Sequence, residues 1–255
     1  MDIIGAFFTI LTILFVVLPT IGIVLLIRYV IKKSKADQPK HVLEKEQHDM
    51  LAKARSKKHK LSQWQKQSIE EISNDLNFNY VKGFTRRFNG YIKSLNGESL
   101  LYFRRLDRGQ FKTTSKIIAI ASNFEIFYSQ TQEEISVYVN EAFFGKISPG
   151  KIFNSKQELI GTHNRMTSGK PYYEVILNNQ RIAYVLKNTE RRTLLKNPFH
   201  DARPSNPLEV DVFEQNPVSI NEMMQLCKAP DDYEYHWLRC IVIYEIIYYG
   251  IDFLQ

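Results

Sequence analysis

The chain begins with a long apolar run. Residues 3–27 are 25 positions without a charged side chain, and as a helix at about 1.5 Å per residue they exceed the roughly 30 Å hydrocarbon thickness of a bilayer. Pro19 lies inside the run and is expected to kink the helix. A cleaved signal peptide would need a positive segment first, whereas only Met1 and Asp2 precede the run. The pattern predicts a transmembrane anchor over residues 1–35.

Polar positions dominate residues 36–97, for which we expect a helical, basic juxtamembrane stalk followed by a docking helix. His41–Lys58 is highly charged and has few apolar positions, which is typical of a solvated helix. Ser62 and Gln65 have the spacing of a capping box. Apolar side chains then recur at helical spacing, at Trp64, Ile69, Ile72 and Leu76.

From about Leu100 the apolar period changes to two, which indicates β-strands. The clearest segments are Leu100–Phe103, Ile117–Ile120, Phe124–Tyr128 and Ile135–Val139. Three hairpins follow, with the turn pairs Asn140-Glu141, Ser155-Lys156 and Asn178-Asn179. Asn tolerates the positive φ that a type I′ turn requires. The returning strands repeat a small residue, which predicts close approach to something bulky on the inner face, at Gly145, Gly161 and Ala183.

The pattern becomes irregular after the third hairpin. Residues 197–207 contain three prolines and are expected to form a connection, and residues 208–213 (LEVDVF) are one more candidate strand. Ser219 and Glu222 are spaced to cap a short helix that ends near Cys227.

A final helix is predicted over Tyr235–Phe253, with Asp231 and Glu234 as its capping pair. It is apolar nearly all round, so that it is buried on every side or lies in a membrane. Arg239 and Glu245 interrupt it and leave fewer than 18 residues free of charge, which disfavours a second span. We expect the helix to be threaded through a closed barrel; a second membrane helix and a partner-facing helix are the alternatives.

Charge is distributed unevenly within a formal net charge of +7. Arg28–Lys60 carries 11 Lys and Arg against 4 Asp and Glu, and Lys82–Lys116 carries 9 against 2. Positive residues after the apolar run predict a single-pass protein of the cell membrane with its N-terminus outside and its C-terminal domain in the cytoplasm. These juxtamembrane charges either set only the topology or also attract an anionic leaflet. They are Arg28, Lys32, Lys33, Lys35 and Lys40.

The second basic stretch alternates arginines with aromatic residues. Arginine beside aromatic rings can bind the phosphate of a lipid headgroup or of nucleic acid. Alternatively, the aromatics belong to the core and the arginines form a solvated face. The candidate lipid- or phosphate-binding residues are Arg86, Arg87, Arg104, Arg105 and Arg108, among Phe84, Phe88, Tyr91, Tyr102, Phe103 and Phe111.

No catalytic motif is found in the chain. GxSxG, Walker, GxGxxG and HExxH patterns are absent, and the six histidines form no ligand-spaced cluster. We therefore expect no catalytic residue, no metal and no cofactor. Cys227 and Cys240 cannot form a disulfide framework and agree with a reducing compartment.

The strand pairs VYVNEAFFGKI, IFNSKQELIGTHNR and YEVILNNQRIAYVL, closed by the helix WLRCIVIYEIIYYGID, resemble the tubby-like C-terminal fold superfamily. This superfamily includes tubby-like, LURP-one-related and phospholipid-scramblase-like proteins. The resemblance covers residues 98–255 and is one of pattern. It implies a closed β-barrel around a central hydrophobic helix, and lipid recognition by basic residues, here the five arginines above. Unlike scramblase-like members, this chain has its hydrophobic segment at the N-terminus, and it has no EF-hand-type Ca²⁺ loop.

These features together predict an N-terminal transmembrane helix and helical stalk followed by an α+β, mostly antiparallel β-barrel that encloses a hydrophobic C-terminal helix. The expected function is that of a membrane-anchored, non-enzymatic binding module whose cytosolic barrel recognises an anionic phospholipid or a membrane-associated protein. The alternative is a structural or interaction subunit of a membrane protein complex, with no ligand of its own. Nucleic acid is not expected as a partner.

Overall fold

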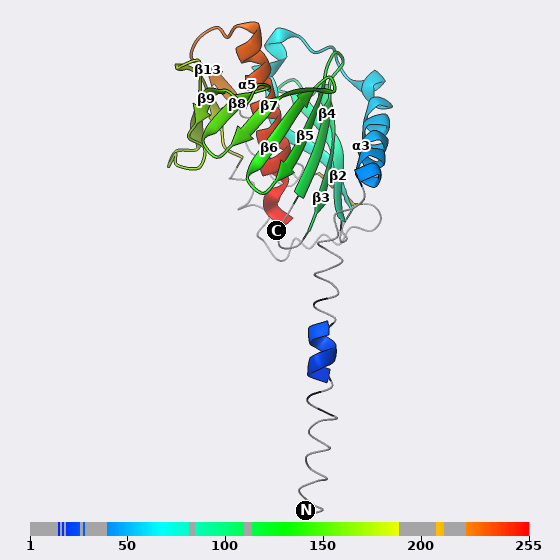
Figure 1. The fold of residues 1–255 in the computed structure, drawn as a ribbon. Coiled ribbons are helices and arrows are strands. Elements are labelled where there is room, and N and C mark those ends of the chain that lie inside the picture. The colour runs from blue at the N-terminus through cyan, green and yellow to red at the C-terminus, as the bar shows by residue number, and fades with distance from the viewer. Residues whose placement is uncertain are drawn as a thin grey trace, which may run out of the picture. The chain divides into compact units, whose positions relative to one another are not determined.

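The computed structural model describes residues 40–81, 85–109, 114–188, 208–211 and 223–254, and within the apolar run residues 15, 17, 19–25 and 28. Side chains are described for these residues apart from 40–44, 75, 208–211 and 252–254. The chain divides into two compact units, residues 1–48 and residues 49–255. The second unit contains the β-sheet and is the part that positions the candidate site (Figure 1).

The predicted transmembrane anchor over residues 1–35 is wrong. No helix in the described part of the chain is long and apolar enough to cross a membrane. The single-pass topology and the cell-membrane localisation that were inferred from that anchor are corrected with it.

The five juxtamembrane positions are only partly described. Arg28 is exposed, and Lys40 is the first residue of helix α3 (Lys40–Arg55). Lys32, Lys33 and Lys35 lie outside the described residues.

Helix α3 agrees with the first half of the predicted stalk, and two 3₁₀ turns follow it, η2 (Lys58–Lys60) and η3 (Lys66–Ile69). The predicted docking helix is wrong, because strand β1 (Ile72–Val81) begins where it should continue. Ile72 and Leu76 fit helical spacing, but burial alternates from Leu76 through Phe78 to Tyr80, with half-exposed residues between them. The capping box also differs from the prediction, since it joins Gln65 to Ser68 in η3.

The thirteen strands of the described residues form one antiparallel sheet in the order β12-β1-β2-β3-β4-β5-β6-β7-β8-β9-β10-β11-β13. The four strands predicted between Leu100 and Val139 are confirmed as β3 to β6. The candidate strand at 208–213 is confirmed over 208–211 as β12, and residues 212 and 213 lie outside the described residues. The remaining bounds are β2 (Thr85–Ser94), β3 (Ser99–Arg108), β4 (Thr114–Ile120), β5 (Glu125–Thr131), β6 (Glu134–Val139), β7 (Ala142–Ser148), β8 (Lys151–Asn154), β9 (Leu159–His163), β10 (Tyr172–Leu177), β11 (Gln180–Leu186), β12 (Leu208–Asp211) and β13 (Met224–Leu226).

The hairpin turns form where the sequence predicts them. Asn140 and Glu141 have φ of 48° and 69°, and Asn178 and Asn179 have φ of 50° and 61°, as a type I′ turn requires. The turn after β8 is wider than the predicted pair, and its left-handed residue is Gln157, with φ 66°. The short helix predicted to end near Cys227 is wrong where it is described, because residues 224–226 are strand β13; Ser219, Glu222 and the 197–207 connection lie outside the described residues.

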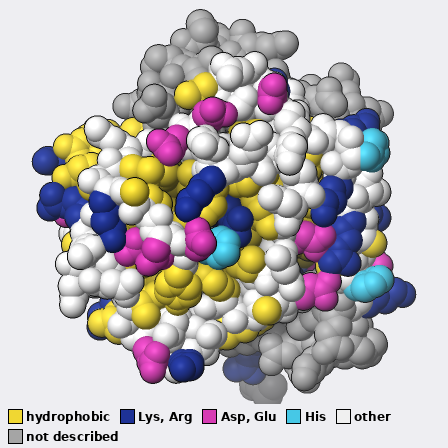
Figure 2. Space-filling model, turned by 90° about the horizontal axis from the view of Figure 1, so that it is seen from above, with side chains coloured by type: hydrophobic (Ala, Val, Ile, Leu, Met, Phe, Trp, Pro, Cys, Tyr) yellow, Lys and Arg dark blue, Asp and Glu magenta, His cyan; other side chains and the backbone are white. Residues whose placement is uncertain are grey.

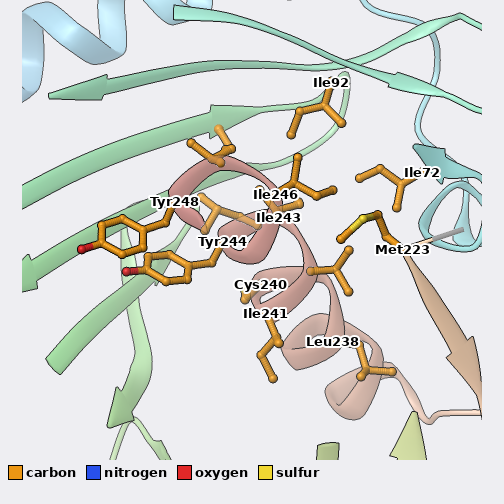
Figure 3. Packing of buried hydrophobic residues seen from close by; sticks show 14 of the residues in the cluster. Ile72, Ile92, Met223, Leu238, Cys240, Ile241, Ile243, Tyr244, Ile246 and Tyr248 are labelled. Atoms are coloured by element: carbon orange, nitrogen blue, oxygen red, sulfur yellow. The ribbon is translucent and has the colours of Figure 1, made fainter. Parts of the chain in front are cut away.

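The C-terminal helix α5 (Asp232–Tyr248) lies against the inner face of the sheet and continues into the 3₁₀ turn η4 (Tyr249–Leu254) (Figure 1). Its predicted capping box is confirmed, since the Asp231 side chain accepts from Glu234 N at 2.8 Å and the Glu234 side chain accepts from Asp231 N at 3.1 Å. Figure 3 shows the helix turns of Ile243 and Ile246 close to Ile72 and Met223.

The predicted closed β-barrel is wrong, because the described sheet is open. Within the described residues β12 pairs with β1 and β13 pairs with β11, and these two short strands are its edges. The helix is nevertheless buried along its length, as predicted, from Glu234 to Tyr248 apart from His236. An open sheet that curls around one helix therefore buries a helix that is apolar on all sides, although the sheet does not close into a barrel.

The small residue of the first hairpin touches this helix. A Cβ on Gly145 would lie 2.2 Å from Phe153 O and 2.8 Å from the Trp237 ring, and the residue has φ 156°. The predicted close approach is thus confirmed at Gly145. At Gly161 the crowding comes from the neighbouring strand instead, since a Cβ there would lie 2.3 Å from Ile176 O.

Candidate functional site

The five predicted arginines do not share one face of the sheet. Residues directly opposite each other in an antiparallel pair have side chains on the same face, and Phe88 of β2 lies opposite Arg105 of β3. Phe88 packs in the core with α5, so this is the inner face. Arg86, two residues before Phe88, shares this face, while Arg87, Arg104 and Arg108 alternate to the outer face.

Arg105 is an interior residue, with 2% of its surface exposed. It forms an ion pair of 2.8 Å with Asp107, and its Nη1 donates to the carbonyls of Ile247 at 3.2 Å and Tyr248 at 2.7 Å. These carbonyls belong to the last turn of α5, which lacks intrahelical donors. Ser115 Oγ donates to Asp107 at 2.7 Å and completes the cluster. Arg105 therefore caps the buried end of α5 and is not available to an external phosphate.

On the outer face, the register places four cations around one apolar residue, Leu106. Arg87 and Lys116 lie directly opposite Leu106 on the two neighbouring strands, and Arg104 and Arg108 lie two residues from it along β3. In a sheet these spacings are about 5 Å across strands and about 7 Å along one strand. Arg87 is exposed and the other three are half-buried. We call these residues the outer basic group: Arg87, Arg104, Arg108 and Lys116.

The aromatic residues of the same stretch also divide between the faces. Phe88 and Phe103 belong to the core with α5, as the core interpretation predicted. Tyr91 and Tyr102 lie on the outer face beside Arg104, in an edge-to-face pair with ring centroids 5.1 Å apart. Burial raises the pKa of Tyr102, and the neighbouring Arg104 charge opposes that rise. Phe84 and Phe111 lie outside the described residues.

The last turns of α3 border the outer basic group. Met50 and Ala54 are buried against Leu106 and neighbouring outer-face residues. At the end of the helix Arg55 forms ion pairs with Glu125 at 2.7 Å and with Glu141 at 2.5 Å. These ion pairs hold the end of the helix on the sheet. Glu125 lies opposite Ile120, four residues along β4 from Lys116 of the outer basic group.

A cavity of about 300 Å³ lies elsewhere, around the start of the segment between β9 and β10. His163 lines it, and its Nε2 lies 3.1 Å from Ser148 O, which assigns Nε2 as the donor and Nδ1 as the acceptor. That Nδ1 is buried without a hydrogen-bond partner in the described structure, and burial lowers the pKa of His163. Glu174, the other titratable residue of the lining, is paired with Arg181 at 3.2 Å.

In the described part of the chain, no group of three or more His, Cys, Asp or Glu side chains could hold a metal ion. Both cysteines are free, and burial raises the pKa of the Cys240 thiol to about 12. The strongest chemical feature of the described surface is therefore the outer basic group.

Sequence reasoning missed Lys116 as a member of this group. Lys116 directly precedes the apolar segment Ile117–Ile120 that predicts β4, so the predicted strand begins one residue too late to include it. Extending the period-two pattern by one residue would have placed it on the face opposite to Ile117.

Comparisons of the chain with protein-family models, with curated proteins and with solved structures found no match. They identify no tubby-like or scramblase-like superfamily, and the resemblance described above stays a prediction.

Proposed function

We propose that the unit formed by residues 49–255 is a binding domain, without catalytic activity, that recognises the phosphate groups of an anionic phospholipid surface through its outer basic group. The observation that carries this proposal is the register around Leu106, which puts four cations from three strands on one face. Three guanidinium groups and one ammonium favour phosphate because guanidinium forks bind its oxygens in pairs.

The magnitude of the expected attraction is sufficient for reversible binding. Each Lys or Arg near an anionic surface contributes about 1 kcal/mol. Four such residues therefore contribute about 4 kcal/mol, roughly a thousandfold in affinity. This attraction is electrostatic, so it must weaken as added salt shortens the Debye length.

The test is flotation of the full chain with phosphatidylcholine vesicles that contain or lack phosphatidylserine, at low and at high salt. We expect enrichment on the phosphatidylserine vesicles at low salt, its loss at high salt, and its loss when Arg87→Glu and Arg104→Glu are combined. Lys151→Glu is the matched control, because Lys151 is an exposed cation on β8, five strands from β3.

A second arm distinguishes the source of the phosphate. Inorganic pyrophosphate is titrated alone and as a competitor of the vesicles. Binding of pyrophosphate by the wild type without enrichment on anionic vesicles would overturn the lipid surface as the ligand. Equal flotation of the wild type and the double variant would overturn the outer basic group as the site and would favour the interaction-subunit alternative.

A further inference from the structure

Among the described residues, the buried charged side chains are paired, with one exception. The buried charged side chains of the described structure form the pairs Arg105 with Asp107, Arg165 with Glu245, and Glu234 with Lys228. Arg239, on the inner-facing helix α5, is also buried, with 6% of its surface exposed, and forms no ion pair within the described residues. A buried charge that lacks a partner is costly, because it loses water without gaining an opposite charge.

The surroundings of Arg239 hold its guanidinium in place but do not neutralise it. The guanidinium carbon lies 3.7 Å from the centroid of the Phe124 ring and 5.9 Å from that of Tyr235. Its Nε is buried without a hydrogen-bond partner in the described structure. Burial lowers the pKa of Arg239, and the groups that oppose this shift are the Cys240 thiol and the Tyr235 and Tyr128 phenols, with no carboxylate among them.

The side chains around this guanidinium are aromatic and are joined by hydrogen bonds. Trp64 packs edge-on against Phe124 with centroids 5.0 Å apart, and its Nε1 donates to Tyr235 Oη at 3.0 Å. Tyr235 Oη in turn donates to Gln65 O at 3.3 Å. The Phe124 ring covers one side of the guanidinium, whose Nε has no hydrogen-bond partner in the described structure.

The site lies toward the surface at the beginning of α5. Helical side chains lean toward the N-terminus, so Arg239 reaches the turn that holds Tyr235 and His236. Lys66 Nζ lies 5.7 Å from the Tyr235 ring centroid and pairs with Asp232 at 3.0 Å. Figure 2 looks onto the end of the molecule where α5 begins and shows Lys or Arg, Asp or Glu and His side chains gathered at the middle of this face, among hydrophobic ones.

We infer that Arg239 is the base of an oxyanion-binding site, in which a carboxylate or phosphate group lies against the in-plane donors of its guanidinium between the aromatic walls. The planar fork of arginine matches these anions in a bidentate manner. Lys66, already paired with Asp232, lies against the Tyr235 ring, and burial together with the Arg239 charge lowers the pKa of the neighbouring His236. The site is separate from the outer basic group, because the two lie on opposite faces of the sheet.

The test uses the full chain and two anions, inorganic phosphate and acetate, in a chloride buffer of constant ionic strength. Thermal unfolding and tryptophan fluorescence are recorded, since Trp64 is one of only two tryptophans and lies in the wall of the site. We expect a saturable rise in Tm and a saturable change in fluorescence with at least one anion. Phosphate stabilises many proteins non-specifically, so the decisive quantity is the difference between matched variants.

Arg239→Met should remove the saturable response and should be at least as stable as the wild type in chloride alone, because it removes an unpaired buried cation. Arg239→Lys keeps the charge without the fork and should weaken the response by about tenfold or more. Arg87→Met, on the outer face, should keep the full response. The inference is overturned if the wild type shows no saturable response, or if folded Arg239→Met or Arg239→Lys responds as the wild type does.

Discussion

Arg104 and Arg105 are adjacent in sequence and have opposite surroundings. Arg105 points to the inner face, where Asp107 and two α5 carbonyls satisfy its guanidinium. Arg104 points to the outer face, where its neighbours are Tyr102 and the other cations of the outer basic group. The difference shows that, in an arginine-rich strand, alternate residues can stabilise the core while the residues between them place positive charge on the outer face.

The largest effect should come from replacing Arg105, the arginine on the inner face. Arg105→Met leaves Asp107 buried without its partner and the last α5 carbonyls without a donor. We expect a loss of about 3–5 kcal/mol in the free energy of unfolding, measured by urea denaturation. Arg104→Met is the matched control and should change that free energy by no more than about 0.5 kcal/mol. Equal losses in the two variants would contradict the division of roles.

A second prediction concerns space on the inner face. Gly145→Ala places a Cβ against Phe153 O and the Trp237 ring. Such crowding is expected to cost about 1–3 kcal/mol of stability, measured in the same denaturation experiment. Gly169→Ala is the control, because nothing lies within 4 Å of a Cβ there. A tolerated alanine at position 145 would mean that α5 packs more loosely than described.

The role of the outer basic group is tested by replacing two of its arginines with neutral residues. Arg87→Gln combined with Arg104→Gln removes two cations, so that binding to phosphatidylserine vesicles should fall about 30-fold at low salt. The free energy of unfolding should stay within about 0.5 kcal/mol of the wild-type value. If binding persists while the protein is folded, the outer basic group is not the lipid-binding surface.

The smallest expected effect is a change in the free energy of unfolding with pH. It comes from the titration of His163 and does not involve the arginines. Burial lowers the pKa of His163 below its ordinary value near 6.5. The unfolded state therefore binds the proton more readily, and stability should fall as the pH drops below about 6.5. His163→Gln should flatten this part of the pH profile measured by urea denaturation. An unchanged profile in the variant would assign the pH dependence to other groups.

Much of the fold could be predicted from the sequence because it rests on local patterns. Period-two alternation indicated β3 to β6, the pairs Asn140-Glu141 and Asn178-Asn179 indicated two type I′ turns, and Asp231 with Glu234 indicated the start of α5. The docking helix failed because Ile72 and Leu76 fit both helix and strand spacing, and only the burial of Phe78 and Tyr80 decides between them.

Long-range features could not be predicted in this way. Closure of the sheet depends on which strands meet at its edges, and the pairing of β1 with β12 joins segments far apart in the chain. The split of the arginines was missed because the predicted strand ended at Phe103, before Arg104 and Arg105, whereas β3 continues to Arg108. Glu245 and Arg239 both interrupt the apolar helix in sequence, and only the folded structure shows that Glu245 meets Arg165.

The most direct test of the central claim is to locate the surface that meets the anionic lipid. An environment-sensitive fluorophore is attached at Thr85→Cys, on the outer face opposite Arg108, or at Ser155→Cys, in the exposed turn after β8, in a full chain carrying Cys227→Ser. Cys240 is buried and should not react. We predict a spectral shift at position 85 and none at position 155 when phosphatidylserine vesicles are added at low salt. A shift at position 155 alone, or no shift at either position, would contradict the account.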